Sequence, residues 1–549
     1  MLVDAFENRT GDPKLDALGR MAEDWLSQGL LRTQLVDVVD PRVVFVQTRS
    51  AGTNAIDPLA LARKTGATFV VTGNYYRTGD SVLFQAAISD ARTGRIVRVV
   101  GPIGAAHDSA VKALDDLRSR AMTALASVVD FHGAHGIESG GEIPPFDAYQ
   151  AYVEGLDAYW HGDGRRAEHL FLDAARRDAA FTDAAVAAAS VVSNENECAV
   201  VDSIAHSLNA AARPLDRIQR LTLQIAVARC HGHNDEMLRL TLERADLEPQ
   251  TSSLRLSAVA AALWANRPHR ALELLQHINP ETDLAWSTDS SHFYYWSGYA
   301  EALHLLGDHR AELESANRMP GIAPLTKAWL RGRALAALAR PAETLAIVDT
   351  LLTLQTETSN SLGLAPYTDG RAEYSATPGW VAFWIARELA VHGDSVTSRA
   401  VATRGLEWCR SRPPNERATV EERLVAVWLL ELTGAYADAE RSARSLRAED
   451  STNVDYWGML GSVAAEHGDT ALADSADRWL ARQTSDVVGW SASYYRARIA
   501  ALRDRRADAI ARLREAADKG VWMTYLHFDP ALVPLHAMPD YVALTALKD

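Results

Sequence analysis

Small residues and turn residues recur along most of this chain in one order. In the segment "YWGMLGSVAAEHGDTALA", Trp457 is followed by Gly461, then by Gly468-Asp469 and Ala473. Two antiparallel helices approach closely only where side chains are short. A glycine ends a helix at low cost because it adopts the left-handed backbone conformation. The order therefore predicts a pair of helices joined by a Gly-Asp turn, with Gly461 of the first helix against Ala473 of the second.

Six further segments show the same order, and the turn glycines Gly434 and Gly468 lie 34 residues apart. The order W-x2-L-G and this spacing resemble the tetratricopeptide repeat. We therefore predict an irregular all-α tetratricopeptide-type solenoid over 146–549, with a terminal cap from about 521, where prolines interrupt the pattern. The six segments are AYVEGLDAYWHGDGRRAEHLFLDAARRD, AALWANRPHRALELLQHI, YYWSGYAEALHLLGDHRAEL, FWIARELAVHGDSVTSRA, VAVWLLELTGAYADAERSARSL and SYYRARIAALRDRRADAIARLREAADKG.

Before residue 105 the hydrophobic pattern changes from helical to alternating. The stretch from Thr68 to Arg77 predicts a strand, Gly79-Asp80 a turn, and "SVLFQAAISDARTGRIVRVV" a β-hairpin that turns at "DARTG". Upstream, "LDALGRMAEDWLSQGLLRT" places its apolar residues on one helical face, and "DPLALARKTG" predicts a shorter helix after Asp57. Together these elements predict a small α/β domain, so the fold class overall is α+β.

The words "FENRTGDPKLDALG" and "GATFVVTGNYYRTGDSVLFQAAISDARTG" resemble the TolB-like domain that precedes tetratricopeptide repeats in bacterial signalling proteins. This resemblance implies a TolB-like domain over 1–105, a connecting helix and Gly-rich linker over 106–145, and the repeats after it. It also implies the sensory or scaffolding half of a membrane serine/threonine kinase. No kinase portion is present in the chain, which begins inside an apolar run, so we expect further sequence upstream of Met1.

Composition narrows the classes of partner. The 549 residues exceed what one ordinary core accommodates, and the net charge of -15 opposes binding to nucleic acid, whose phosphates require Lys and Arg. The acidic balance favours neutral or basic partners. No apolar window approaches the roughly 18 residues of a membrane span, so the chain is soluble as written. The compartment stays open, and is periplasmic if the chain is the distal part of a membrane kinase.

Three cysteines, Cys198, Cys230 and Cys409, lie far apart without C-x-x-C spacing, so the sequence suggests neither a zinc site nor a disulfide framework. Two histidine groups invite a metal interpretation: His132 with His135, and the run "CHGHND". Neither has a second pair of ligands at suitable spacing. We interpret "HGHN" as an inter-helix turn, and we expect no metal site and no cofactor.

Motifs for catalysis are absent from the sequence: there is no kinase signature, Walker loop, nucleophile elbow or H-E-x-x-H. The loop "NRTGDPK" contains phosphate-compatible residues, but its spacing matches no phosphate loop, and a strand-to-helix turn capped by Asp12 explains it better. We therefore predict no catalytic residues and no enzymatic activity. A nucleotide-binding enzyme that uses the amino-terminal domain is the less favoured alternative.

The predicted function is a protein-interaction scaffold or sensor that binds a protein or peptide in a concave repeat groove. Tyrosines are favoured at interfaces. Several tyrosines lie on the first-helix face that lines the concave side in such solenoids, and the aromatic run "SHFYYWSGY" offers more. A structural subunit of a larger assembly is an alternative. The predicted partner contacts are Tyr149, Tyr152, Tyr159, Tyr294 and His304.

Overall fold

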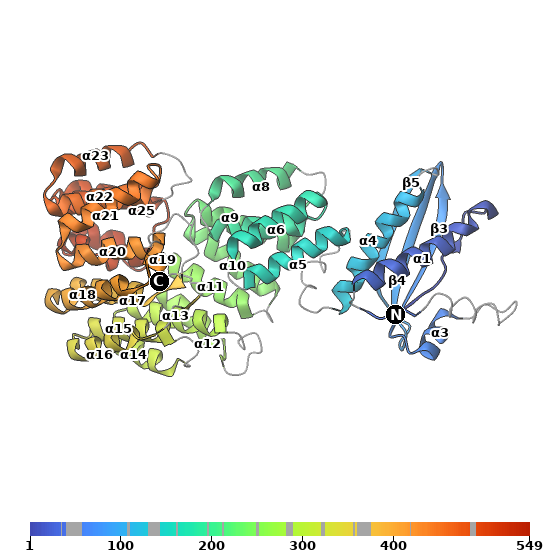
Figure 1. Ribbon diagram of the computed structural model, residues 1–549, viewed down its shortest axis with the longest axis horizontal. Coiled ribbons are helices and arrows are strands. Elements are labelled where there is room, and N and C mark those ends of the chain that lie inside the picture. The colour runs from blue at the N-terminus through green and yellow to red at the C-terminus, as the bar shows by residue number, and fades with distance from the viewer. Residues whose placement is uncertain are drawn as a thin grey trace. The chain divides into compact units, whose positions relative to one another are not determined.

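The structure is a computed structural model of the whole chain, which folds into two compact units (Figure 1). Unit 1 comprises Met1–Ala188 with Pro214–Asp216, and unit 2 comprises Ala189–Arg213 with Arg217–Asp549. The residues described are 1–33, 36–39, 57–106, 110–129, 143–160, 163–194, 197–210, 214–248, 252–280, 289–319, 324–354, 357–358, 375–417, 419–483 and 490–549.

Unit 1 contains a sheet of five strands in the order β1-β3-β4-β5, with β2 also paired to β3. The short β1 and β2 run parallel to β3, whereas β3, β4 and β5 form an antiparallel meander. The predicted hairpin and its two turns are therefore confirmed. The strands are β1 Leu2–Val3, β2 Glu7–Asn8, β3 Phe69–Thr78, β4 Ser81–Asp90 and β5 Ile96–Ala106.

Three helices pack on this sheet. Helices α1 (Asp16–Thr33) and α4 (Ala110–Val129) contact each other and lie on one face, where they form a core with alternate strand residues such as Val71 (Figure 1). Helix α3 (Pro58–Thr65) packs with Val70, whose side chain points to the opposite face because side chains alternate along a strand. Both predicted helices of this region, α1 and α3, are confirmed.

Most described helices after α4 belong to antiparallel pairs. All seven segments predicted from sequence form antiparallel pairs: α5/α6, α11/α12, α13/α14, α17/α18, α20/α21, α22/α23 and α24/α25. The α+β class with a helical solenoid is thus confirmed. The bounds are α5 Phe146–Trp160, α6 Gly164–Arg177, α7 Thr182–Asn194, α8 Cys198–Ala210, α9 Arg217–Cys230, α10 Asn234–Leu247, α11 Ser252–Trp264, α12 Pro268–Gln276, α13 Asp289–Leu305, α14 His309–Arg318, α15 Pro324–Ala337, α16 Pro341–Leu351, α17 Pro378–Val391, α18 Ser395–Ser411, α19 Pro414–Arg417, α20 Val420–Thr433, α21 Tyr436–Glu449, α22 Val454–His467, α23 Thr470–Leu480, α24 Ser491–Leu502 and α25 Arg506–Asp518.

The inter-helix turns use the predicted backbone conformation. Gly468 has φ +85° and ends α22, and the side chain of Asp469 then accepts a hydrogen bond from the Leu472 N–H to begin α23. Gly461 was predicted to pack against Ala473 of the second helix, but its close neighbours are Ala476 and Ile499. A Cβ there would lie 2.7 Å from the Ala476 Cβ and 2.6 Å from Ile499 of the next pair, so the glycine admits α24 as well as α23.

The chain ends in α26 (Met523–His527), a 3-10 helix η6 (Pro530–Leu535) and α27 (Pro539–Thr545). We refer to residues 521–549 as the C-terminal segment. A two-stranded ribbon, β6 (Glu357–Thr358) with β7 (Ser375–Ala376), precedes α17. Among the described residues, no helix is both long and apolar enough to cross a membrane.

Candidate functional site

First helices of successive pairs in unit 2 carry charged side chains into its interior. We define the inner face as the surface of α13, α15, α17, α20, α22 and α24 that bears these side chains; the C-terminal segment contacts it at α13, α17 and α24. Its buried charged residues are Glu301, Arg333, Arg387, Glu388, Glu431 and Arg498. Buried charges are costly unless they are paired and hydrogen-bonded, so this concentration needs an explanation.

The C-terminal segment supplies hydrogen-bond partners for several of these buried residues. The Thr524 hydroxyl donates to Glu301 (2.6 Å), and Arg387 donates to the Tyr525 carbonyl (3.4 Å). Farther along, the Asn266 amide donates to the Ala546 carbonyl (2.8 Å). The inner face that sequence analysis predicted as an open groove is therefore occupied by the chain's own carboxyl end.

Three histidines and two glutamates form a histidine cluster, which we define as His304, His309, His392, Glu312 and Glu388. Glu312 Oε2 lies 2.7 Å from His304 Nδ1 and 3.1 Å from His309 Nδ1. Glu388 Oε1 lies 3.3 Å from His304 Nε2 and 2.9 Å from His392 Nε2. His304 therefore lies between two carboxylates, at the junction of α13, α14 and α17.

Arg333 of α15 connects the histidine cluster to Glu301. Its Nε donates to Glu312 Oε1 (2.8 Å), and its Nη1 donates to Glu301 Oε2 (2.6 Å). Burial and Arg333 lower the pKa of His304, but Glu312 and Glu388 outweigh both effects and raise it to about 9. Burial opposes ionisation of Glu312, yet His304 and Arg333 lower its pKa to about 2. The arrangement holds separated charges of both signs in a dry interior.

A second group, the arginine cluster, consists of Arg387, Arg498, Glu431, Glu466 and Asp529. Arg498 contacts Asp529 and, through Nη2, Glu431 Oε1 (2.8 Å). Three carboxylates face two guanidinium groups, which leaves one negative charge in excess. Burial, then repulsion from Glu431, raises the pKa of Glu466 to about 8. The arginine cluster thus retains a proton near neutral pH.

The predicted partner contacts fall in different environments. Tyr149 and Tyr152 of α5 are buried, and the Tyr152 ring packs against Phe171 and Phe181. Tyr159 is 37% exposed. The side chain of Tyr294 lies outside the described residues.

His304, the fifth predicted contact, is a buried member of the histidine cluster. The sequence analysis did not single out the neighbours of His304. The signal was present as charged residues inside otherwise apolar first helices, as in "YAEALHLL", "LRGRALAA", "WIARELAV" and "YRARIAAL".

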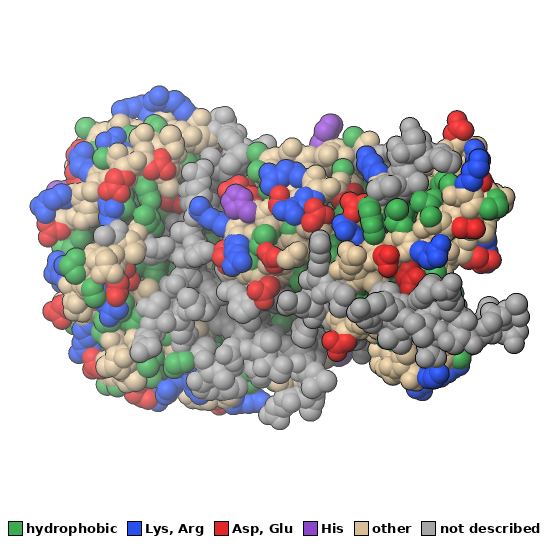
Figure 2. All heavy atoms as spheres, turned by 45° about the vertical axis from the view of Figure 1, so that its right-hand side comes forward, with side chains coloured by type: hydrophobic (Ala, Val, Ile, Leu, Met, Phe, Trp, Pro, Cys, Tyr) green, Lys and Arg blue, Asp and Glu red, His purple; other side chains and the backbone are tan. Residues whose placement is uncertain are grey.

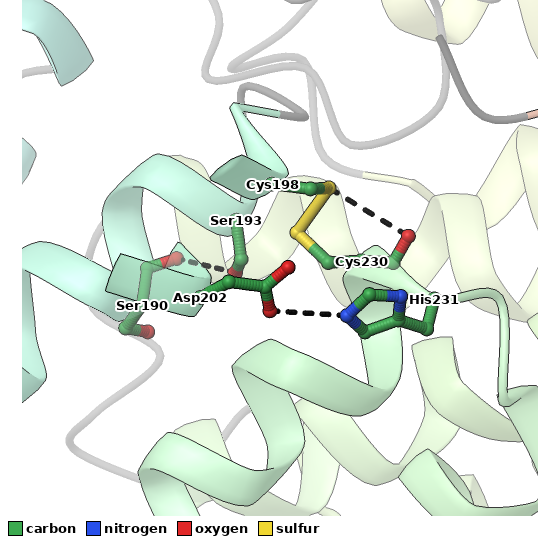
Figure 3. The surroundings of a disulfide bond; sticks show 6 residues. All are labelled: Ser190, Ser193, Cys198, Asp202, Cys230 and His231. Atoms are coloured by element: carbon green, nitrogen blue, oxygen red, sulfur yellow. Dashed lines mark hydrogen bonds and ion pairs between the residues drawn. A yellow bond between two sulfur atoms is a disulfide. The ribbon is translucent and has the colours of Figure 1, made fainter. Parts of the chain in front are cut away.

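The expectation of no disulfide is wrong. Cys198, at the start of α8, and Cys230, at the end of α9, form a disulfide with a Cα–Cα distance of 5.3 Å (Figure 3). The pair could not be predicted from a separation of 32 residues, because the two cysteines meet only when α8 and α9 pack antiparallel to each other. His231 follows Cys230 and contacts Asp202 (3.0 Å).

The structure also bears on the histidine groups and on the loop "NRTGDPK" that the sequence analysis considered as ligand sites. Residues 231–233 form the predicted turn between α9 and α10, and Cys230 is not available to a metal because it is disulfide-bonded. His132 and His135 lie outside the described residues. In "NRTGDPK", the Asp12 side chain accepts from the Lys14 N–H and begins the helical turn η1 (Pro13–Leu15), as predicted.

The surface carries both signs of charge. On the face shown in Figure 2, acidic and basic side chains are interspersed. Exposed ion pairs such as Arg239 with Glu236 (2.6 Å) join side chains of opposite sign.

The geometry defines a helical repeat protein built of antiparallel helix pairs, which follow a small α/β sheet domain. No family model and no curated protein sequence matches the chain. Among solved structures, the chain is similar to one in the APC/C hetero-tetramer Cut9–Hcn1, at 15% identity and a TM-score of 0.30 over 79% of this chain and 81% of that one.

Two further similar structures are a chain of Naa15/Naa10 bound to HypK-THB and one of the Chs5–Bch1 exomer cargo adaptor complex. The first has 13% identity and a TM-score of 0.23, over 71% of this chain and 64% of that one. The second has 11% identity and a TM-score of 0.25, over 86% and 82%. These scores are too low to support a conclusion, so the repeat assignment depends on the helix pairs described above.

Proposed function

We propose that this chain is a non-catalytic protein-interaction module, a scaffold or sensor, whose repeats hold a protein or peptide segment. The observation that carries the proposal is intramolecular. The inner face of unit 2 holds residues 521–549, a segment of short helices and turns, through hydrogen bonds and ion pairs. Helical repeats bind extended partners through many modest contacts of this kind.

Partner binding on the inner face would require displacement of the C-terminal segment. Leu526, Leu532 and Leu535 of that segment are fully buried, and exposing each costs roughly 1.5–3 kcal/mol. A partner therefore contacts other surfaces, and Tyr159 is the predicted contact that the structure shows exposed. The net charge of -15 favours a neutral or basic protein and opposes nucleic acid.

The test uses the full chain as bait against extract from its source. Each captured protein is then purified and titrated by calorimetry against the wild type, Tyr159→Ala and a control, Val396→Ala, which changes an apolar residue that is 81% exposed on α18. We expect direct binding that weakens in Tyr159→Ala alone. Unchanged affinity in both variants would remove Tyr159 from the interface, and no direct binding would contradict the module itself.

An enzymatic alternative is tested separately by a thermal-shift screen with nucleotides. A true ligand at 100 times its dissociation constant adds about 2.7 kcal/mol of stability, so a shift of that size from ATP or GTP would overturn the non-catalytic assignment. Light scattering of the purified chain tests the remaining alternative, a structural subunit. A stable homo-oligomer would favour it.

The finer proposal is that residues 1–105 form a TolB-like domain and that the chain is the sensory half of a bacterial signalling protein outside the cytoplasm. Two observations support this: the helix and meander arrangement of unit 1, and the Cys198–Cys230 disulfide, since disulfides persist mainly in oxidising compartments. Differential alkylation of cysteines in intact cells checks the compartment. Reduced Cys198 and Cys230 would contradict it.

A further inference from the structure

The turn between α13 and α14 brings together three side chains that can each donate a metal ligand. The ligand atoms of His304, His309 and Glu312 all lie within 4.8 Å of one another. We propose that these three residues bind a divalent transition-metal ion of the zinc class. The proposal goes beyond the proposed interaction function and does not depend on it.

Each buried ligand is held by a further residue, as in protein metal sites. His304 presents Nδ1 to the site while its Nε2 lies 3.3 Å from Glu388 Oε1. Metal-binding histidines commonly donate their second ring N–H to a carboxylate, which fixes the ring and its tautomer. Glu312 presents Oε2 while Oε1 accepts from Arg333 Nε (2.8 Å). Both ligands are therefore oriented before any ion enters.

The charge of the surroundings matches a divalent cation. The carboxylates of Glu301, Glu312 and Glu388 lie around one guanidinium, that of Arg333, in a buried region. With an ion bound the imidazoles are neutral, and three negative charges against one positive charge then leave an excess of two negative charges. A divalent ion coordinated by neutral imidazoles balances that excess, and neutral imidazole is the form that binds metals.

The distances between the three ligand atoms are close to those of a zinc site, and only a small movement is needed to admit the ion. Glu312 Oε2 lies 2.7 Å from His304 Nδ1 and 3.1 Å from His309 Nδ1, so one oxygen faces two imidazole nitrogens. Zinc binds nitrogen and oxygen at about 2.0–2.2 Å in a tetrahedron, so Glu312 Oε2 must move away from the two nitrogens by a few tenths of an ångström.

The site borders the protein surface at His309 and His392. The side chains of His309 and His392 are 16% and 33% exposed, and their ring centroids lie 5.8 Å apart. The fourth ligand position is therefore left to water or to His392.

The competing explanation is a metal-free ion pair, in which His304 carries two protons and donates to Glu312 and Glu388. Burial and charge pairing alone would then account for the cluster. The two explanations differ in a measurable way, since only the first predicts stoichiometric binding of an added ion.

The test titrates EDTA-treated, dialysed full-length chain with ZnCl2 by calorimetry and with CoCl2 by visible spectroscopy. We expect a single ion per chain and the intense visible bands of four-coordinate cobalt. His309→Gln should weaken zinc binding by at least about 10-fold, as loss of even a supporting residue does. Zinc-edge absorption spectroscopy should show nitrogen and oxygen ligands without sulfur.

The matched control is His467→Gln, which changes another histidine that contacts a glutamate, Glu440, at 3.0 Å but is 43% exposed and has no second ligand partner among the described residues. It should leave zinc affinity unchanged. Equal affinity of the wild type and His309→Gln, or no stoichiometric binding by the wild type, would overturn the proposal. If circular dichroism shows that His309→Gln is unfolded in EDTA, the cobalt spectrum and the zinc-edge data of the wild type decide between the metal site and the metal-free ion pair.

Discussion

Asp529 in the C-terminal segment accepts hydrogen bonds on both carboxylate oxygens from Arg498 Nη1 of α24, each 2.8 Å long. Asp529 also accepts from the Tyr494 hydroxyl (2.5 Å) and lies 3.9 Å from Arg387 of α17. The residue is fully buried. One carboxylate thus connects the carboxyl end of the chain to two helices of the inner face.

Asp529→Asn should strongly destabilise unit 2. The amide has one accepting oxygen in place of two and places an N–H donor against Arg498 and Tyr494, and breaking a buried hydrogen-bonded ion pair costs about 3–5 kcal/mol. Urea unfolding followed by circular dichroism measures the loss. The control, Asp540→Asn, breaks the exposed pair with Arg514 (2.8 Å) and should cost at most about 1 kcal/mol. Similar losses in the two variants would show that Asp529 does not anchor the segment.

Reduction of the Cys198–Cys230 disulfide should lower the free energy of unfolding. The bond closes a loop between residues 32 apart, and the loss of chain entropy in the unfolded state is worth roughly 3–4 kcal/mol at that length. Thermal unfolding with and without dithiothreitol measures the effect. The double variant Cys198→Ser/Cys230→Ser should be insensitive to the reductant, whereas Cys409→Ser, which changes a buried free thiol, should stay sensitive.

Gly461→Ala should destabilise the α22–α24 region by about 1–3 kcal/mol, because the added Cβ would lie within 2.7 Å of Ala476 and Ile499. Gly468→Ala offers the comparison. Its Cβ meets open space, but its φ of +85° strains an L side chain by roughly 1–2 kcal/mol. Crystal structures or exchange data would show displaced α24 in the first variant only; an undisplaced α24 would contradict the packing role of Gly461.

The stability of unit 2 should fall between pH 7 and 9. The folded-state pKa of Glu466, raised to about 8 from 4.5, means that the folded state retains a proton that the unfolded state has lost. The stabilisation is complete below about pH 4.5 and is lost progressively as pH rises from there through 8; the part lost between pH 7 and 9 is about 1 kcal/mol. In Glu466→Gln the urea midpoint should change less with pH between pH 7 and 9 than it does in the wild type. A slope that persists in the variant would assign the effect to another group.

The sequence was sufficient for local structure. The period of apolar residues and the turn residues after them depend on neighbours in the chain, so the β3–β5 meander, α1, α3 and seven helix pairs were all predicted correctly. The cap at Asp12 and the turn at 231–233 were correct for the same reason.

The candidate site was only partly visible. His304 was named as a partner contact, but its neighbours Glu388 and Arg333 lie on later helices of the chain, 84 and 29 positions away, and their proximity is a result of repeat stacking. The disulfide escaped prediction in the same way. The sequence shows which charged residues lie inside apolar helices, but it does not show which of them contact each other in the fold.

The sequence by itself determined that this protein is a small α/β unit followed by paired helices, because helix, strand and turn preferences act over a few residues. The tertiary structure alone decided what the inner face does. Stacking brings charged side chains from distant helices together, where an apolar interior forces them to pair, and the C-terminal segment supplies the groups that complete that pairing.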